Sequence, residues 1–235
     1  MEVLVFFIGK LMPFVTLTIL IVGLFYKLVH WQRAAVGNIA LFPSATGRGQ
    51  LFGKVLGEVV FFSSFRKQDN SLWKRTWIFH ATLVLIILGH SRLISDYPLR
   101  VMMGLSEGTV SAISAWGGGI AGVLAMVTCL MLLARRFGIR RVREISSGED
   151  YSVLILLLFI LITGNAMRFL SHYDITETQL YFRTLFGAGA IQVPHDPMFL
   201  LHFFLVQLLL IYLPFGKFLH IPGIFYSRTL LAKDY

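Results

Sequence analysis

The sequence predicts an all-α integral membrane protein, and three features of its composition and pattern indicate that class. Hydrophobic residues make up 56% of the 235 residues, which exceeds the roughly 45–50% of ordinary soluble domains. Charged residues make up only 14%, and the mean hydropathy is +0.73. Five apolar stretches are each long enough to cross about 30 Å of hydrocarbon as a helix.

The five stretches place the predicted membrane helices at about residues 3–29, 77–95, 111–134, 152–171 and 197–219. Pro13 is expected to kink the first helix or to lie in its first turn, and Pro214 is expected to kink the fifth. We expect one domain over residues 1–235. Segment 31–76 then lies outside the bilayer on the cytoplasmic side. Its apolar pairs at 51–52, 55–56 and 59–60 recur at helical spacing, which predicts a surface helix that faces water, lipid or a partner subunit.

Positive charge falls mainly on one side of this predicted bundle. Sixteen of the 21 Lys and Arg residues lie on the side that carries residues 31–76 and the C-terminus. Because cytoplasmic loops carry the excess of Lys and Arg, we expect a multi-pass protein of the cytoplasmic (inner) membrane with its N-terminus outside. Topology and anionic lipid account for the net charge of +9, so we expect no nucleic-acid partner.

Four of the seven histidines fall in two of the predicted helices, namely His80 and His90 in the second and His202 and His220 in the fifth. An ionisable residue inside a membrane helix is costly and indicates a functional site. His202 and His220 are separated by five helical turns, or about 27 Å along one face. His80 and His90 are separated by about 15 Å along the axis.

The predicted topology sorts these histidines into two pairs, with His80 and His220 toward the cytoplasm and His90 and His202 toward the outside. A structural zinc ion usually takes four protein ligands, whereas each pair supplies two. Haem iron takes two axial ligands and its macrocycle fills the remaining positions. The pattern therefore predicts five transmembrane helices bundled around two stacked b haems. The single cysteine, Cys129, excludes an all-Cys iron–sulfur cluster within this chain.

Residues 77–90, with both histidines of the second helix, and the segment from His202 through His220 to Gly223 resemble the gamma subunit of respiratory nitrate reductase. The two histidine spacings and Leu132-Leu133-Ala134-Arg135-Arg136 after the third helix carry this resemblance. Residues 56–66 and the ending from His220 to Arg228 are more similar to the sulfite-reductase-associated (DsrM-type) and heterodisulfide-reductase-type membrane cytochromes.

The resemblance implies that His80 with His220 and His90 with His202 ligate two haem b groups. It also implies that menaquinol is oxidised near the outer side and that electrons pass to a cytoplasmic iron–sulfur subunit, with further membrane or extracytoplasmic redox subunits as possible partners. Quinol in that family is associated with an outer-loop lysine, but this chain has no lysine between Lys74 and Lys217.

Other polar residues are candidates for supporting roles. A quinol site needs proton acceptors beside a haem, and the outer-side candidates are His172, Asp174, Arg92 and Glu107. Arg135 and Arg136 are candidates for pairing with haem propionates, although charge that sets topology explains them equally well. Gly89 beside His90 permits close approach of a porphyrin face.

The sequence leaves other functions open. One is the gamma subunit of a respiratory nitrate reductase, and another is a haem-bearing anchor without a quinol site. An alternative of a different class is a haem-free membrane anchor or transporter in which the histidines relay protons.

Overall fold

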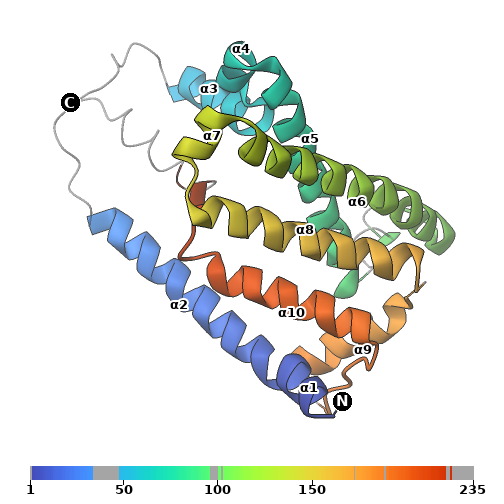
Figure 1. Ribbon diagram of the computed structural model, residues 1–235. Coiled ribbons are helices and arrows are strands. Elements are labelled where there is room, and N and C mark those ends of the chain that lie inside the picture. Colours follow the sequence, from blue (N-terminus) through green and yellow to red (C-terminus); the bar gives the residue numbers. More distant parts are fainter. Residues whose placement is uncertain are drawn as a thin grey trace. The chain divides into compact units, whose positions relative to one another are not determined.

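The computed structural model describes residues 2–33, 48–95, 100–101, 103–171, 173–187, 189–220 and 223. These residues form helices joined by turns and loops, without a strand in the described ranges (Figure 1). The α-helices are α1 (Glu2–Phe6), α2 (Met12–Arg33), α3 (Arg48–Phe61), α4 (Ser63–Gln68), α5 (Asn70–His90), α6 (Glu107–Gly138), α7 (Arg140–Ile145), α8 (Gly148–Phe169), α9 (Ile175–Phe186) and α10 (Pro197–Tyr212). The π-helix η1 (Phe7–Leu11) joins α1 to α2, and two 3-10 helices are η2 (Ser91–Leu93) and η4 (Lys217–Leu219).

Four segments of the described chain are long and apolar enough to cross a membrane. They are Glu2–Arg33, Asn70–Leu93, Glu107–Gly138 and Gly148–Phe169. The second of them begins at Asn70, so the helix starts before the predicted position 77 and includes residues 70–76. That those residues lie outside the bilayer stays a prediction. The fifth membrane span stays a prediction, because α10 has 16 residues and is therefore about 24 Å long.

The C-terminal boundary of α10 differs from the prediction of one helix over residues 197–219. The helix ends at Tyr212 and is followed by a turn, Gly216 and η4. Pro214 explains the difference because proline lacks a backbone N–H and disfavours helical backbone in the residue before it. The proline therefore ends α10 rather than kinking it, and His220 lies after η4 rather than on α10.

Pro13 changes the pattern of backbone hydrogen bonds in the first span. Met12 donates its backbone N–H to the Phe7 carbonyl, which is the π-helical pattern, and Pro13 has no N–H to donate to Gly9. Two carbonyls thus lose their helical donors. The Tyr181 hydroxyl donates to the Gly9 carbonyl at 2.9 Å, and Gln207 Nε2 donates to the Ile8 carbonyl at 3.1 Å. Side chains from α9 and α10 therefore satisfy backbone groups that neither water nor lipid would satisfy in a membrane.

Helices α6 and α8 form an antiparallel pair that packs along much of its length (Figure 1). Asn165 Nδ2 donates to the Gly122 carbonyl at 3.1 Å, and Arg168 Nη1 donates to the Ser114 carbonyl at 2.7 Å. Asp150 closes a capping box with Ser147 at the start of α8, which satisfies the first amides of that helix.

The chain divides into two compact units. The first unit comprises Met1–Thr16 and Ile78–Leu209, and the second comprises Leu17–Trp77 and Leu210–Tyr235. In the first unit a buried aromatic cluster joins α9 to α10, with Tyr181, Phe199 and Phe203 packed edge-to-face or stacked. This cluster immobilises the N-terminal half of α10, which carries His202.

Candidate functional site

The first unit brings His90 and His202 together from two helices. His90 is the last residue of α5, and His202 lies in the second turn of α10. Their ring centroids are 6.4 Å apart and their ring planes differ by 16°. The two ring planes are therefore nearly parallel, and the ring centres are too far apart for direct van der Waals contact.

Each of these imidazoles has its Nδ1 atom engaged by the chain. Nδ1 of His202 lies 2.9 Å from the Thr163 hydroxyl oxygen, and the Thr163 hydroxyl in turn donates to the Phe159 carbonyl at 2.9 Å. Because that hydroxyl hydrogen is used, His202 Nδ1–H is the donor to Thr163. Nδ1 of His90 lies 2.7 Å from the Ile86 carbonyl, an acceptor, so it is also protonated. Both bonds fix the tautomer whose Nε2 lone pair can bind a metal.

The spacing of the two rings fits one metal ion between them. Two bonds of about 2 Å to imidazole nitrogens, with about 1 Å more from each nitrogen to its ring centre, place the centroids about 6 Å apart. The observed 6.4 Å agrees with this value. Two imidazoles meet here among the described residues, so a metal held by this pair would take its other ligands from a group such as a porphyrin.

Two glycines adjoin this pair and behave differently. A Cβ atom at Gly164 of α8 would lie 3.1 Å from Cε1 of His202, so the absence of a side chain at Gly164 lets the ring pack against the α8 backbone. Among the described residues, a Cβ atom at Gly89 would meet nothing within 4 Å. The contacts of these residues therefore do not require glycine at position 89, and its role beside a flat macrocycle stays a prediction.

His80 and His220 lie in different units. His80 is half-buried on α5, where its ring meets Phe79 edge-on at a centroid distance of 5.5 Å. His220 follows η4 in the second unit, and its Nδ1 lies 3.0 Å from the Lys217 carbonyl. This carbonyl orients the His220 ring in the way that the Ile86 carbonyl orients His90. The pairing of His80 with His220 stays a prediction.

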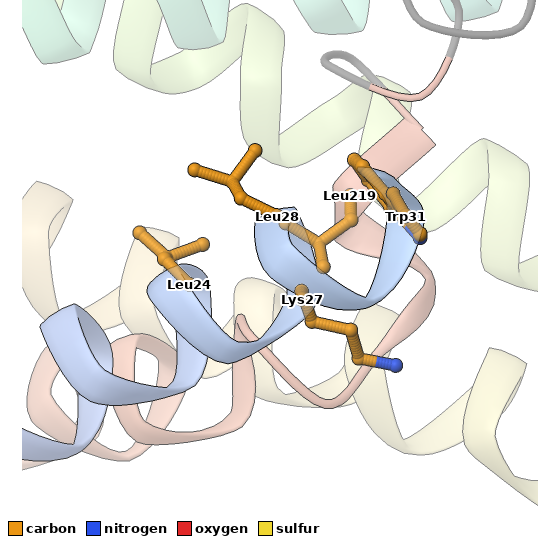
Figure 2. A pocket seen from close by; sticks show the side chains of 5 residues that line it. All are labelled: Leu24, Lys27, Leu28, Trp31 and Leu219. Carbon is orange, nitrogen blue, oxygen red and sulfur yellow. The ribbon is translucent and has the colours of Figure 1, made fainter. Parts of the chain in front are cut away.

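A small cavity lies beside the residue that precedes His220, within the second unit. Leu24, Lys27, Leu28, Trp31 and Leu219 line about 220 Å³. Figure 2 shows the Lys27 amino group pointing away from the four apolar side chains. The volume of this cavity is below the roughly 300–1,000 Å³ of typical cofactor sites. The cavity is therefore too small to be a haem pocket.

The arginines predicted to pair with propionates lie in the last turn of α6. Arg136 donates to the Ser146 hydroxyl at 2.8 Å and lies 3.9 Å from the Asp150 carboxylate. It therefore stabilises the turn between α6 and α8. Arg135 is half-buried on the same helix. A propionate contact of either arginine stays a prediction.

The described candidates for the predicted quinol site have different contacts. Glu107 begins α6 and lies 3.8 Å from Arg100 in an exposed ion pair. Asp174 is the N-cap of α9, and its carboxylate accepts from the Thr176 amide at 2.9 Å. Arg92 is buried in η2, where its carbonyl accepts from Gln179 at 2.9 Å. The fourth candidate, His172, lies outside the described residues.

Tyr173, which the sequence analysis did not single out, lies between α8 and α9. Its ring stacks on Phe199 at 5.6 Å, and its hydroxyl accepts from Thr178 at 3.1 Å. Burial raises the pKa of Tyr173 to about 12. The hydroxyl is therefore protonated at neutral pH and available as a donor.

Sequence reasoning also missed Thr163 and Gly164, which position His202. Both are ordinary residues of a membrane helix when the chain is considered alone. The adjacent hydroxyl and missing side chain within the apolar run of α8 were the available signal. Their role depends on which helix packs against them, which spacing within one helix does not reveal.

Several long apolar helices, with a histidine pair between two of them, are typical of a multi-pass membrane protein. The family model of the nitrate reductase gamma subunit matches residues 62–235, and the chain belongs to that family.

Three relatives illustrate the range of the family. The chain is 30% identical to the Hdr-like menaquinol oxidoreductase cytochrome b-like subunit of Archaeoglobus fulgidus, over 94% of this chain and 78% of the relative. It is 23% identical to the protein of the same description in Archaeoglobus profundus, over 93% and 76%. It is 26% identical to the nitrate reductase gamma chain of Bacillus subtilis, over 90% and 88%. The names of these relatives describe subunits of oxidoreductase complexes.

Proposed function

We propose that the chain is the di-haem cytochrome b subunit of a respiratory complex that oxidises menaquinol near the outer membrane face and delivers electrons to a cytoplasmic iron–sulfur partner. The observation that supports this most directly is the His90–His202 pair, with ring centroids 6.4 Å apart and both Nδ1 atoms engaged. Bound haem would supply one-electron redox chemistry, which imidazole side chains do not provide.

The residues of the chain would bind, orient and shield these groups. His90 and His202 would hold the outer haem, and His80 and His220 would hold the inner one. Thr163 orients His202, while Gly164 lets its ring approach α8. The buried aromatic cluster around Tyr181 and Phe199 excludes water from the α9–α10 side. At the outer side, Asp174, Arg92, Glu107 and His172 remain the proposed quinol-site candidates.

The direction across the membrane follows from charge. The excess of Lys and Arg at residues 27–75, after α6 and near the C-terminus puts the N-terminus outside and the C-terminus in the cytoplasm. His90, at the end of α5, would then lie toward the outside. Electrons from the outer pair would reach the inner pair and then the cytoplasmic partner.

The two kinds of relative suggest two complexes. A heterodisulfide-reductase-like menaquinol oxidoreductase is favoured because the Archaeoglobus fulgidus relative has the higher identity, 30% against 26%, and the wider coverage of this chain. A nitrate reductase gamma subunit is the second proposal. Identifying the cytoplasmic subunit that co-purifies with the native chain distinguishes them.

An oxidised-minus-reduced visible spectrum, together with haem and protein quantification, tests the haem proposal. We expect a b-type alpha band and two haems per chain. A well-expressed, folded chain without that band would overturn the proposal and favour a haem-free anchor or proton relay. Reduction of the band by a menaquinol analogue tests the quinol step, and failure of that reduction with both haems bound would favour an anchor without a quinol site.

A further inference from the structure

Two tryptophans at the start of α5 hold the C-terminal end of α3. Trp73 Nε1 donates to the Phe61 carbonyl at 2.6 Å, and Trp77 Nε1 donates to the Val60 carbonyl at 2.9 Å. The last carbonyls of a helix have no partner within the helix. Phe62, in the left-handed region with φ of 49°, ends α3 directly after them. All of these residues belong to the second unit.

The depth of these tryptophans in a membrane is constrained by α5. They are one helical turn apart within the candidate span Asn70–Leu93, at its N-terminal end. Tryptophan at the end of a membrane helix lies at the level of the lipid headgroups, where its ring is apolar and its N–H needs a partner. Because the two indole N–H groups bond to α3, the end of α3 is held at that same level.

Four large apolar side chains near this anchor are exposed. On α3 they are Leu56, Val60 and Phe61, and Phe65 of α4 continues the group, which we call the α3 apolar face. The Phe61 side chain is 58% exposed, although its backbone carbonyl accepts the hydrogen bond from Trp73. Four large apolar side chains at the depth of the headgroups match the composition of a helix that lies in the membrane surface.

The charges beside the α3 apolar face are positive. Arg66 and Lys67 are exposed, and the Arg66 guanidinium lies 5.1 Å from the Trp73 ring centroid. The two nearby carboxylates are half-buried and accept hydrogen bonds from their own segment. Glu58 accepts from the Ser63 hydroxyl at 2.7 Å, and Asp69 accepts from the Leu72 amide at 2.9 Å. Exposed cations beside apolar side chains complement anionic lipid headgroups.

We propose that α3 and α4 lie in the headgroup layer of the bilayer, at the N-terminal end of α5, with the α3 apolar face toward the acyl chains and Lys67 toward anionic phosphates. The occupant of this face is lipid rather than a protein subunit. The surface is independent of the haem sites, so its test does not depend on the proposed redox function.

Depth-dependent fluorescence quenching tests the proposal. Phe61→Cys and Phe65→Cys, each labelled with an environment-sensitive fluorophore, are compared with labelled Lys67→Cys in vesicles of phosphatidylglycerol and phosphatidylcholine. The buried Cys129 gives the labelling blank in the unsubstituted chain. We expect acyl-chain bromines to quench positions 61 and 65 roughly twofold or more over position 67, and aqueous iodide to do the reverse.

Two results would overturn the lipid assignment. One is equal iodide quenching at all three positions without quenching by acyl-chain bromines. The other is shielding of positions 61 and 65 from both quenchers in the native complex when the isolated chain leaves them open to iodide, because that pattern identifies a protein-docking surface.

The anchor itself is tested with Trp73→Phe, which keeps an aromatic ring and removes the N–H. We expect increased iodide quenching of the label at position 61. The matched control is Trp116→Phe on α6, where the exposed Trp116 is far from α3 in sequence and no change is expected. An unchanged signal in Trp73→Phe would show that the indole bonds do not set the depth of α3.

Discussion

The two predicted histidine pairs differ in where their members lie. His90 and His202 both belong to the first unit, where helix packing brings their rings to a centroid distance of 6.4 Å. His80 belongs to the same unit, whereas His220 belongs to the second unit. His220 directly follows η4, which comes after the end of α10 at Tyr212. The difference teaches that helix packing within one unit can bring two histidines together, whereas the proposed partner of His80 lies in another unit, directly after a short 3-10 helix.

The largest expected effect comes from removing either outer ligand. His90→Ala or His202→Ala should lower the haem content from two per chain to one, because a haem iron with one axial imidazole is weakly held. Pyridine haemochrome analysis of the purified protein measures the loss. His30→Ala is the matched control, since His30 stacks on Tyr26 rather than on another histidine. Retention of two unaltered haems in both outer variants would refute the ligand assignment.

His220→Ala sharpens the comparison between the two pairs. We expect loss of the inner haem with the outer haem retained, because the contacts that assemble His90 and His202 lie in the first unit. Potentiometric titration of the alpha band should then show one component, with the midpoint potential of the outer haem. Loss of both components would show that the outer site is not assembled independently.

Thr163→Val removes the acceptor that orients His202. Loss of such a supporting partner typically weakens metal binding about 10–100-fold, so haem retention by the outer site should fall within that range. Competition with apomyoglobin measures retention. Thr163→Ser keeps the hydroxyl and should behave as the unsubstituted chain does. Equal haem loss from both variants would attribute the effect to packing rather than to the hydrogen bond.

Tyr181→Phe tests the frame of the outer site rather than its ligands. It leaves the Gly9 carbonyl without its donor, and an unsatisfied buried polar group costs about 1–3 kcal/mol of folding free energy. A lower thermal unfolding temperature in detergent with two haems still bound is the expected result. Tyr26→Phe, on the exposed part of α2, is the control and should leave the unfolding temperature unchanged.

The smallest effect is expected at Asp174. Hydrogen bonds from the Thr176 hydroxyl and amide lower the pKa of Asp174, so its stabilisation of α9 is present above the ordinary pKa of an aspartate and is lost as pH falls through the lowered value. Asp174→Ala should slightly lower the thermal unfolding temperature at pH 7. It should also reduce the difference between the unfolding temperature at pH 7 and that in strongly acidic solution. Asp174→Asn keeps a good cap. Lower quinol oxidation in Asp174→Asn at unchanged stability would instead indicate a role for the carboxylate in the quinol site.

The extent to which sequence alone predicts this molecule depends on the range of the interactions. Hydropathy located the four segments that are long and apolar enough to cross a membrane, because about 20 consecutive apolar residues match the thickness of the hydrocarbon layer. The fifth span stays a prediction. The end of α10 was mispredicted because a proline in an apolar run either kinks or ends a helix, and surrounding contacts decide which. The π-helix at Phe7–Leu11 was also missed, since Gln207 and Tyr181, which stabilise it, lie far along the chain.

The candidate site shows the same division. Spacing and topology were enough to propose the pair His90 and His202, whose ring centroids lie 6.4 Å apart in the structure. They could not reveal Thr163 and Gly164, whose importance arises only when α8 packs against α10. Nor could they separate Arg136 as a propionate partner from Arg136 as a partner of Ser146 and Asp150, because both uses need an arginine at the end of α6.

The bond between Tyr181 and Gly9 spans 172 positions of the chain, and this distance constrains the order of biogenesis. During synthesis the first span leaves the ribosome long before α9 and α10 exist. Its Ile8 and Gly9 carbonyls then have no side-chain donors, and hydrocarbon supplies none. The span Glu2–Arg33 therefore emerges well before its backbone hydrogen bonds can be completed. Until the C-terminal helices arrive, we expect its N-terminal turns to stay in the translocon or at the membrane surface.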